Sequence, residues 1–312
     1  MSIMTSMRYV DQLDVEGRRV LLRVDLNVPL RDGSVEDDSR ILAVLPTIQF
    51  ILDNGGMPIV ISHLDRPGGK VVPELSLRPV AERLSEILST EVTFVDEVIG
   101  PKAEQAAGSM RPGSIMMLEN LRFEVGEEDN NDLFSRSLAS LADIYVDDAF
   151  ANAHRSHASN VGVVKHLEES AGGFLMKREL QALEGALESP DRPLVVAIGG
   201  AKVSSKMDVL EHLSRLADRL LLGGAMSLPF LKASGLETGV NRFDGKAEEK
   251  ARTIMESDGK GAIVLPVDFM VTTAGGEIMM VDASAIPAGA QALDIGPRTI
   301  DLFSSELMAA GT

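Results

Sequence analysis

Short apolar runs and amphipathic stretches alternate along the first half of the chain. Runs of branched aliphatic residues are typical of buried strands in a parallel sheet, and apolar residues spaced three and four apart are typical of helices that cover it. The expected strands are residues 20–24, 58–61, 92–95, 115–118 and 144–146. The expected helices are residues 41–52, a helix capped by Ser76, and a helix containing Phe134 and Leu138, which follows an acidic loop at 124–131.

The second half repeats this pattern after a connector at residues 161–173, which contains a short helical piece at 166–170. We expect strands at 194–198, 219–222, 262–267 and 278–281, and helices at 177–187, from Met207 and at 246–256. The stretch 294–299 is expected to open a last helix that ends near Gly311. Strand, loop and helix in repeated order predict an α/β protein. With 312 residues, two Rossmann-like parallel-sheet lobes are favoured, residues 1–170 and 171–312.

Composition and charge narrow the classes of partner. The chain carries 30 Lys and Arg against 47 Asp and Glu, a formal charge of −17, which makes nucleic acid an unexpected partner. It has no cysteine, so disulfides and thiol chemistry are excluded. We find no secretory signal at the N-terminus and no apolar run of about 18 residues, so we expect a cytoplasmic protein without a membrane span.

Cations gather where the expected strands of the first half end. They are Arg23, Arg40, His63, Arg66, Arg122, Arg155 and His157. The carboxyl ends of parallel strands meet at one edge of a sheet, and ligands bind there. Arginine suits the bidentate capture of phosphate and carboxylate, although any one of these residues alone could be a solvated surface charge. His154 and His157 could form a metal pair, but they lack a third ligand nearby, so no protein metal site is expected.

A glycine turn follows the first strand of the second half. Gly199 and Gly200 end the strand, Lys202 and Lys206 follow, and a patterned helix begins at Met207. A strand, a tight turn and a helix N-terminus together place backbone N–H groups around a concavity suited to phosphate. The alternative is an ordinary turn with surface lysines. The stretch matches neither the Walker A loop nor the G-x-G-x-x-G fingerprint.

Five motifs in order, RVDLNVP, SHLDRP, LENLRF, DDAFANAHRSHAS and GGAKVSSK, resemble those of phosphoglycerate kinase, and the resemblance runs from residue 20 to residue 299. It implies that the first lobe binds 3-phosphoglycerate or 1,3-bisphosphoglycerate. The residues carried over by motif position are Asp25 and Asn27 as polar contacts, with Arg23, Arg40, His63, Arg66, Arg122 and Arg155 as the basic cluster. Asp65 departs from the family's usual glycine, and it tolerates positive φ better than most residues.

The same resemblance implies that the second lobe binds ADP or ATP together with Mg²⁺. The implied nucleotide-binding residues are Gly200, Ala201, Lys202, Lys206, Gly223 and Gly224. Arg40 and Lys202 are the implied catalytic residues, because they would stabilise charge on the phosphoryl group in transit. The resemblance also implies a monomeric glycolytic enzyme, with a hinge between the lobes to which the Gly172-Gly173 pair is suited.

Motifs that the family has near its C-terminal end are not found in this sequence. In the family, a W-N-G-P turn, an acidic residue for the ribose and a G-G-G-[DS]-T helix start follow at this point, and the sequence to Thr312 contains none of them. We therefore expect an incomplete second lobe. The alternative to a working kinase is a truncated fragment that binds phosphoglycerate without turnover.

Overall fold

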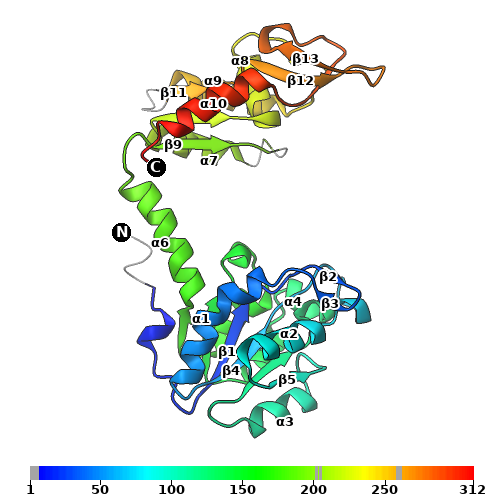
Figure 1. Ribbon diagram of the computed structural model, residues 1–312, viewed down its shortest axis with the longest axis vertical. Helices are drawn as coiled ribbons and strands as arrows, with labels where there is room; N and C mark the ends of the chain where they lie inside the picture. Colours follow the sequence, from blue (N-terminus) through cyan, green and yellow to red (C-terminus); the bar gives the residue numbers. More distant parts are fainter. Residues whose placement is uncertain (1–6, 201–202, 204–205, 258–261) are drawn as a thin grey trace. The chain divides into compact units, whose positions relative to one another are not determined.

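The chain forms two compact units (Figure 1). The computed structural model describes residues 7–200, 203, 206–257 and 262–312. Its contacts divide the chain into Met1–Ala182 and Leu183–Thr312, so the division falls within helix α6 (Phe174–Glu188). The expected boundary lies twelve residues earlier, between residues 170 and 171. Residues after 170 still belong to the first unit because strand β8 (Ser170–Gly172) pairs with its sheet.

The first unit is built on a six-stranded parallel sheet in the order β5-β6-β4-β1-β7-β8. Its other strands are β1 (Arg19–Val24), β4 (Met57–Ile61), β5 (Val92–Val95), β6 (Ile115–Leu118) and β7 (Ile144–Asp148). These five confirm the five strands that the sequence predicts. A small antiparallel pair, β2 (Leu30–Arg31) and β3 (Ser34–Val35), lies outside this sheet.

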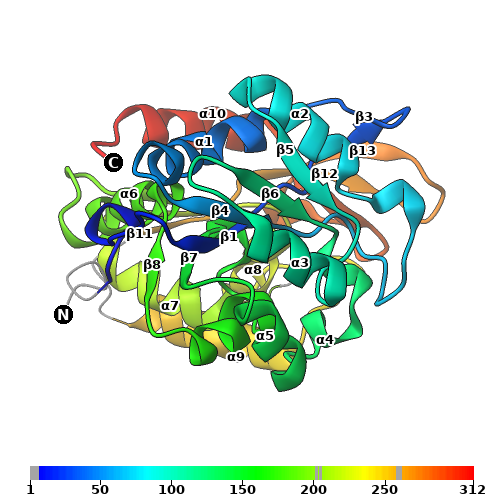
Figure 2. The same ribbon diagram turned by 90° about the horizontal axis from the view of Figure 1, so that it is seen from below.

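Helices cover both faces of this sheet (Figure 2). One face carries α1 (Ser39–Asp53) and α2 (Arg78–Leu88); the other carries α3 (Pro101–Ser109), α4 (Val125–Glu128) and α5 (Asp132–Ala139). Successive side chains of a strand point to opposite faces. In β1, Leu22 therefore joins the core under α1, while Leu21 joins the core under α5. Arg23 lies on the same side of β1 as Leu21, and this places a cation inside the unit.

The second unit combines two sheets. A parallel sheet has the order β11-β10-β9, and an antiparallel sheet has the order β13-β12-β14. The strands are β9 (Val195–Ile198), β10 (Arg219–Leu222), β11 (Ala262–Val264), β12 (Asp268–Thr272), β13 (Ile278–Asp282) and β14 (Gln291–Ile295). The helices are α7 (Met207–Leu216), α8 (Leu228–Ala233), α9 (Gly245–Glu256) and α10 (Pro297–Met308). Helices α7 and α9 share a core with Leu220 of β10, whereas Phe303 of α10 packs with Leu221 from the other side.

The structure confirms the α/β class and corrects several expected elements. The strand expected at 262–267 ends at Val264, and β12 begins at Asp268, because Pro266 cannot continue a strand ladder. The helical piece expected at 166–170 is wrong: a 3-10 helix ends at His166, and Ser170 begins β8. The loop expected at 124–131 contains α4. Helix α3 and strands β12 and β14 were not expected.

Gly172 and Gly173 have a packing role that the sequence did not indicate. A Cβ atom at Gly173 would lie 2.2 Å from Cγ of Asp148, and one at Gly172 would lie 2.5 Å from Cε of Met7. Cε of Met7 is the end of a flexible side chain and can move aside, whereas the buried Asp148 leaves no room for a side chain at Gly173. Close packing therefore accounts for Gly173, and the hinge stays a prediction.

Candidate functional site

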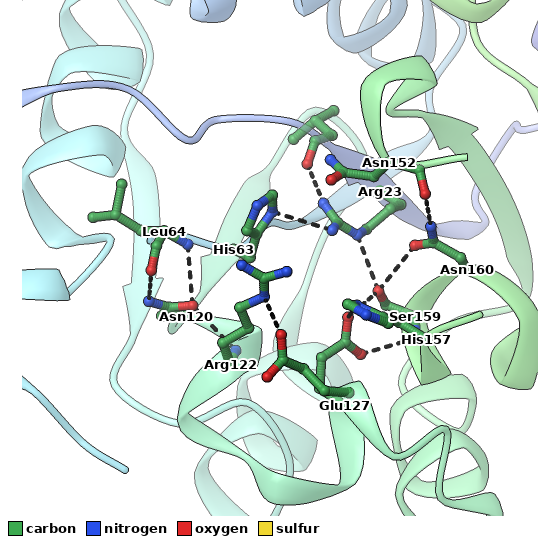
Figure 3. A network of polar contacts seen from close by, with 12 residues as sticks. Arg23, His63, Leu64, Asn120, Arg122, Glu127, Asn152, His157, Ser159 and Asn160 are labelled. Carbon is green, nitrogen blue, oxygen red and sulfur yellow. Dashed lines mark hydrogen bonds and ion pairs between the residues drawn. The ribbon is translucent and has the colours of Figure 1, made fainter. Parts of the chain in front are cut away.

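Arg23 is the centre of a buried polar network at the carboxyl edge of the first sheet (Figure 3). Only 1% of Arg23 is exposed. Its Nε donates to Oγ of Ser159 at 3.0 Å, its Nη1 donates to the carbonyl of Val24, and its Nη2 lies 3.3 Å from Nδ1 of His63. Guanidinium has no acceptor, so Nδ1 of His63 accepts this hydrogen bond. His63 is thus a neutral imidazole with its proton on Nε2.

The surroundings of His63 explain why it stays neutral. Burial, together with the nearby charges of Arg23, Arg122, Arg155 and His157, lowers the pKa of His63 to about 2. These are four of the cations that the sequence placed after strand ends, together with His63 itself. The structure therefore brings together most of the predicted basic cluster.

Arg122 and Asn120 join the loops that follow β4 and β6. Arg122 is 3% exposed; its Nη1 donates to the carbonyl of Asp65 at 2.7 Å, and its Nε lies 3.1 Å from a carboxylate oxygen of Glu128. Oδ1 of Asn120 accepts from the backbone N–H groups of Leu64 and Arg122, both at 3.1 Å. Its Nδ2 donates to the carbonyl of Leu64 at 2.8 Å. This single amide fixes the separation of the two loops.

Glu127 supplies the buried negative charge of the network. It is 0% exposed, and its two carboxylate oxygens accept from the backbone N–H of Ser159 at 3.0 Å and from Oγ of Ser159 at 2.6 Å. Nδ1 of His157 lies 3.7 Å from the same carboxylate. Burial raises the pKa of Glu127, but the nearby imidazole of His157, the charge of Arg23 and the hydrogen bonds from Ser159 lower it more. The net shift is downward, so the carboxylate stays ionised.

Asp25, Asn27 and Arg40 form a second group beside the network. Arg40, in the first turn of α1, donates to Oδ2 of Asp25, while Oδ1 of Asp25 accepts from the backbone N–H of Asn27 at 3.1 Å. Oδ1 of Asn27 in turn accepts from the backbone N–H of Asp65 at 2.9 Å. Asp65 has a φ of 51°, as its place in a glycine position predicts. Its side chain is exposed and forms no ion pair within the described residues.

Within the described residues, two donors of the site lack any partner, and a third, Nε of Arg122, has only its ion pair with Glu128. Nε of Arg155 and Nδ2 of Asn152 are buried, and neither has a hydrogen-bond partner among the described residues. A buried donor without an acceptor is costly, and a bound anion is a group that would supply an acceptor. Arg66 is exposed, and within the described part of the chain it has no hydrogen bond to this network.

In the second unit, the glycine turns after β9 and β10 lie side by side. The backbone N–H of Gly223 donates to the carbonyl of Ile198 at 2.9 Å. A Cβ atom at Gly200, whose φ is 142°, would lie 3.0 Å from Nζ of Lys206. Gly200, Lys206 and the Gly223-Gly224 turn therefore belong to one region. The predicted residues Ala201 and Lys202 lie outside the described residues.

Sequence reasoning missed the polar residues that hold the cations. Glu127 was assigned to an acidic loop, and Asn120, Ser159 and Asn152 were not singled out although each lies within a quoted motif or close to one. His157 was among the strand-end cations but not in the predicted substrate set. A buried counter-charge is required wherever several arginines are buried, and this rule could have drawn attention to the acids after Arg122.

The described residues contain neither a metal-binding cluster nor a membrane-spanning helix. We find no group of three or more His, Cys, Asp or Glu side chains in that part of the chain that could hold a metal ion. Nor does any helix there have the length and apolar character needed to cross a membrane.

Comparison with known proteins gives consistent matches. The family model "Phosphoglycerate kinase" matches residues 10–312. The phosphoglycerate kinases of Granulibacter bethesdensis and Chlorobium phaeobacteroides are 47% and 46% identical, over 98% and 96% of this chain and 78% and 77% of their own lengths. The solved structure of phosphoglycerate kinase from Coxiella burnetii is similar with a TM-score of 0.81 and 34% identity, covering 98% of this chain and 78% of that one. The Pyrococcus horikoshii phosphoglycerate kinase gives a TM-score of 0.77 at 32% identity, covering 97% of this chain and 79% of that one.

Proposed function

The chain belongs to the phosphoglycerate kinase family, and we propose that its two units bind the two substrates of that reaction. The reaction moves a phosphoryl group between 1,3-bisphosphoglycerate and ADP, giving 3-phosphoglycerate and ATP. One observation carries the assignment of the first unit: buried cations meet at a sheet edge where two buried donors have no partner among the described residues. Phosphoglycerate is a small polyanion that matches this chemistry.

The roles in the first unit follow from the groups available. Arg23, Arg122 and Arg155 supply charge, and His63 supplies a neutral N–H donor at Nε2. Asp25 and Asn27 suit a substrate hydroxyl, because their side-chain oxygens can accept its hydrogen bond. The hydrogen bonds that they accept in the loop after β1 hold both side chains in place. Arg40 and Arg66 complete the proposed set as more exposed cations.

In the second unit, we assign the glycine turns to the nucleotide. Gly200, Gly223 and Gly224 allow close approach of the backbone, and Lys206 lies beside Gly200 to meet a phosphate. Ala201 and Lys202 belong to the same proposed set by motif position. Mg²⁺ enters this proposal as part of the substrate, held by the nucleotide phosphates.

Catalysis in this proposal is positioning and charge stabilisation. Phosphoryl transfer spreads negative charge over the transferred group, and no protein nucleophile is needed. Arg40 and Lys202 are the proposed stabilising cations. Lys202→Ala should then lower kcat far more than it weakens substrate binding, whereas equal losses would contradict the role.

A coupled assay on the chain tests the function. Reverse turnover is measured with ATP and 3-phosphoglycerate, with glycerate as the matched control that lacks the phosphate. Turnover with 3-phosphoglycerate and none with glycerate is expected. Calorimetric binding of 3-phosphoglycerate without turnover would favour the alternative of a binding protein, and absence of both would contradict the assignment of the site.

A further inference from the structure

We propose that Glu127 is a positioning residue, which holds Arg23 in place for the substrate through the hydroxyl of Ser159. The inference rests on the proposed function of the first unit and extends it to a residue that touches no ligand. Glu127 lies in α4 and is fully buried, and Arg23 lies in β1. The two side chains are connected by Ser159, which belongs to the π-helical turn Ala158–Gly162.

Glu127 orients the hydroxyl proton of Ser159. One carboxylate oxygen accepts from the backbone N–H of Ser159 at 3.0 Å and the other accepts from its Oγ at 2.6 Å. A serine hydroxyl has one proton, so a hydroxyl that donates to Glu127 faces its other neighbours with lone pairs. Nε of Arg23, 3.0 Å away, can therefore donate to Oγ of Ser159. By taking the hydroxyl proton of Ser159, an ionised Glu127 keeps the lone pairs of Oγ available to Nε of Arg23.

The effect extends to His63. Nη2 of Arg23 lies 3.3 Å from Nδ1 of His63, and Nη1 donates to the carbonyl of Val24. With Nε fixed by Ser159, the guanidinium plane is held at three points, and His63 is confined to the tautomer protonated at Nε2. Glu127 thus determines both the direction of a substrate-binding guanidinium and the donor that a neighbouring imidazole presents.

Glu127 also balances the charge of the cluster. Several buried cations near one another are costly without a compensating anion. Within the described residues, Glu127 is the fully buried carboxylate of this network, while Glu128, which pairs with Arg122, has a side chain that is 44% exposed. The neighbouring Tyr145 braces the arrangement, since its hydroxyl donates to the carbonyl of Ser159 at 2.7 Å.

Glu127→Gln is a sharp test because it preserves shape and reverses one hydrogen bond. The amide oxygen must face the backbone N–H of Ser159, so the NH₂ group faces Oγ. Oγ then accepts from the amide, and its own proton turns to Oδ1 of Asn160, 3.2 Å away, so Nε of Arg23 shares Oγ with a second donor. Arg23 also loses the buried negative charge of Glu127, so we expect binding of 3-phosphoglycerate to weaken about tenfold.

A double-mutant cycle separates positioning from general structural damage. Calorimetric affinity for 3-phosphoglycerate is measured in the full chain for E127Q, R23K and the double variant. Lysine keeps the charge of Arg23 but has no Nε–H for Ser159. If Glu127 acts through Arg23, E127Q adds less than twofold in the R23K background. A full tenfold loss in that background would overturn the proposal.

Two controls accompany the cycle. Asp129→Asn, an exposed carboxylate of the same segment, should bind 3-phosphoglycerate within twofold of the wild type. Ser159→Ala should reproduce the loss in E127Q, because only the hydroxyl carries the contact. An alanine variant with normal affinity and an unchanged melting temperature would contradict the relay.

The tautomer of His63 gives a readout that needs no ligand. In ¹⁵N spectra, the wild type should show His63 as the single neutral tautomer protonated at Nε2, and E127Q should show a mixture. A chain that binds no 3-phosphoglycerate but shows this change would contradict the proposed function alone. A chain that binds it, with E127Q unchanged in both affinity and tautomer, would contradict the positioning role alone.

Discussion

The two proposed anion sites are built from different parts of the chain. In the first unit, buried side chains carry the charge, and hydrogen bonds fix Arg23, His63 and Arg122 before any ligand binds. In the second unit, backbone turns at Gly200 and Gly223 form the region, with the exposed Lys206 beside them. The first site therefore depends on burial of charge, and the second on the close approach of backbone N–H groups.

This difference predicts how each site responds to change. A buried cation cannot be removed without leaving its partners unpaired, so variants of the first site should have large effects that depend on pH. A glycine turn mainly excludes side chains, so variants of the second site should have smaller effects that depend on volume.

The largest expected effect is that of Arg122→Ala on binding of 3-phosphoglycerate. The change removes a buried cation proposed to contact the substrate and leaves the carbonyl of Asp65 without its 2.7 Å donor. We expect about a thousandfold weaker binding, about 4 kcal/mol, by calorimetry. ADP should bind within twofold of the wild type. Arg111→Ala, which removes an exposed arginine of the same unit, is the matched control; comparable losses in both variants would contradict a localised site.

Next in size is the effect of pH through His63. Burial and the nearby cations lower the pKa of His63 to about 2 in the folded state, against 6.5 in the unfolded chain. The stability that this shift contributes is fully present above pH 6.5 and is lost as pH falls toward 2. Between pH 8 and 4 the loss is roughly 3.5 kcal/mol.

Chemical denaturation of the wild type and His63→Asn at several pH values measures this contribution. Asparagine keeps an acceptor for Arg23 but does not titrate, so the difference in unfolding free energy between the two proteins should shrink on acidification. A constant difference from pH 7 to pH 4 would show that His63 gains a proton as easily in the folded protein as in the unfolded one.

Asp148 should act in the opposite direction. It accepts hydrogen bonds from Oγ1 of Thr47 at 2.6 Å and from the backbone N–H of Met176 at 2.9 Å, beneath the start of α6. Burial raises its pKa from 3.8 to about 6. The stability contributed by this group is present below pH 3.8 and is lost as pH rises through about 6, a change of about 3 kcal/mol.

Asp148→Asn should abolish this pH dependence, as followed by denaturant midpoints between pH 4 and 7. Asp129→Asn, which is exposed, should leave it intact. In the second unit, Asp268 occupies a comparable place before α10, yet hydrogen bonds from Thr299 and Arg298 outweigh its burial and lower its pKa. Both aspartates accept several hydrogen bonds, but burial outweighs them at Asp148 and does not at Asp268. A pH response of Asp148→Asn equal to that of the wild type would contradict the raised pKa of Asp148.

The sequence predicted the parts of the molecule that follow local rules. Apolar runs such as 20–24 and 144–146 correspond to strands β1 and β7, since a buried parallel strand is a continuous hydrophobic run. The cations near His63 were predicted because parallel strands end at one edge. Strand β8 was missed because Ser170, Ala171 and Gly172 carry no strand pattern; only pairing with β7 makes them a strand. Glu127 was missed because its role depends on Ser159, 32 positions away.

The smallest expected effect is that of Gly200→Ala on nucleotide binding. The φ of 142° disfavours alanine, and its Cβ would lie 3.0 Å from Nζ of Lys206. Because Nζ is the end of a flexible side chain, it can move aside, so we expect only about tenfold weaker binding of ADP, with binding of 3-phosphoglycerate unchanged. Gly245→Ala is the matched control, since a Cβ at Gly245 meets nothing within 4 Å. A loss as large as that of Arg122→Ala would show that the glycine turn is as tightly packed as the arginine network, and the contrast between the two sites would not hold.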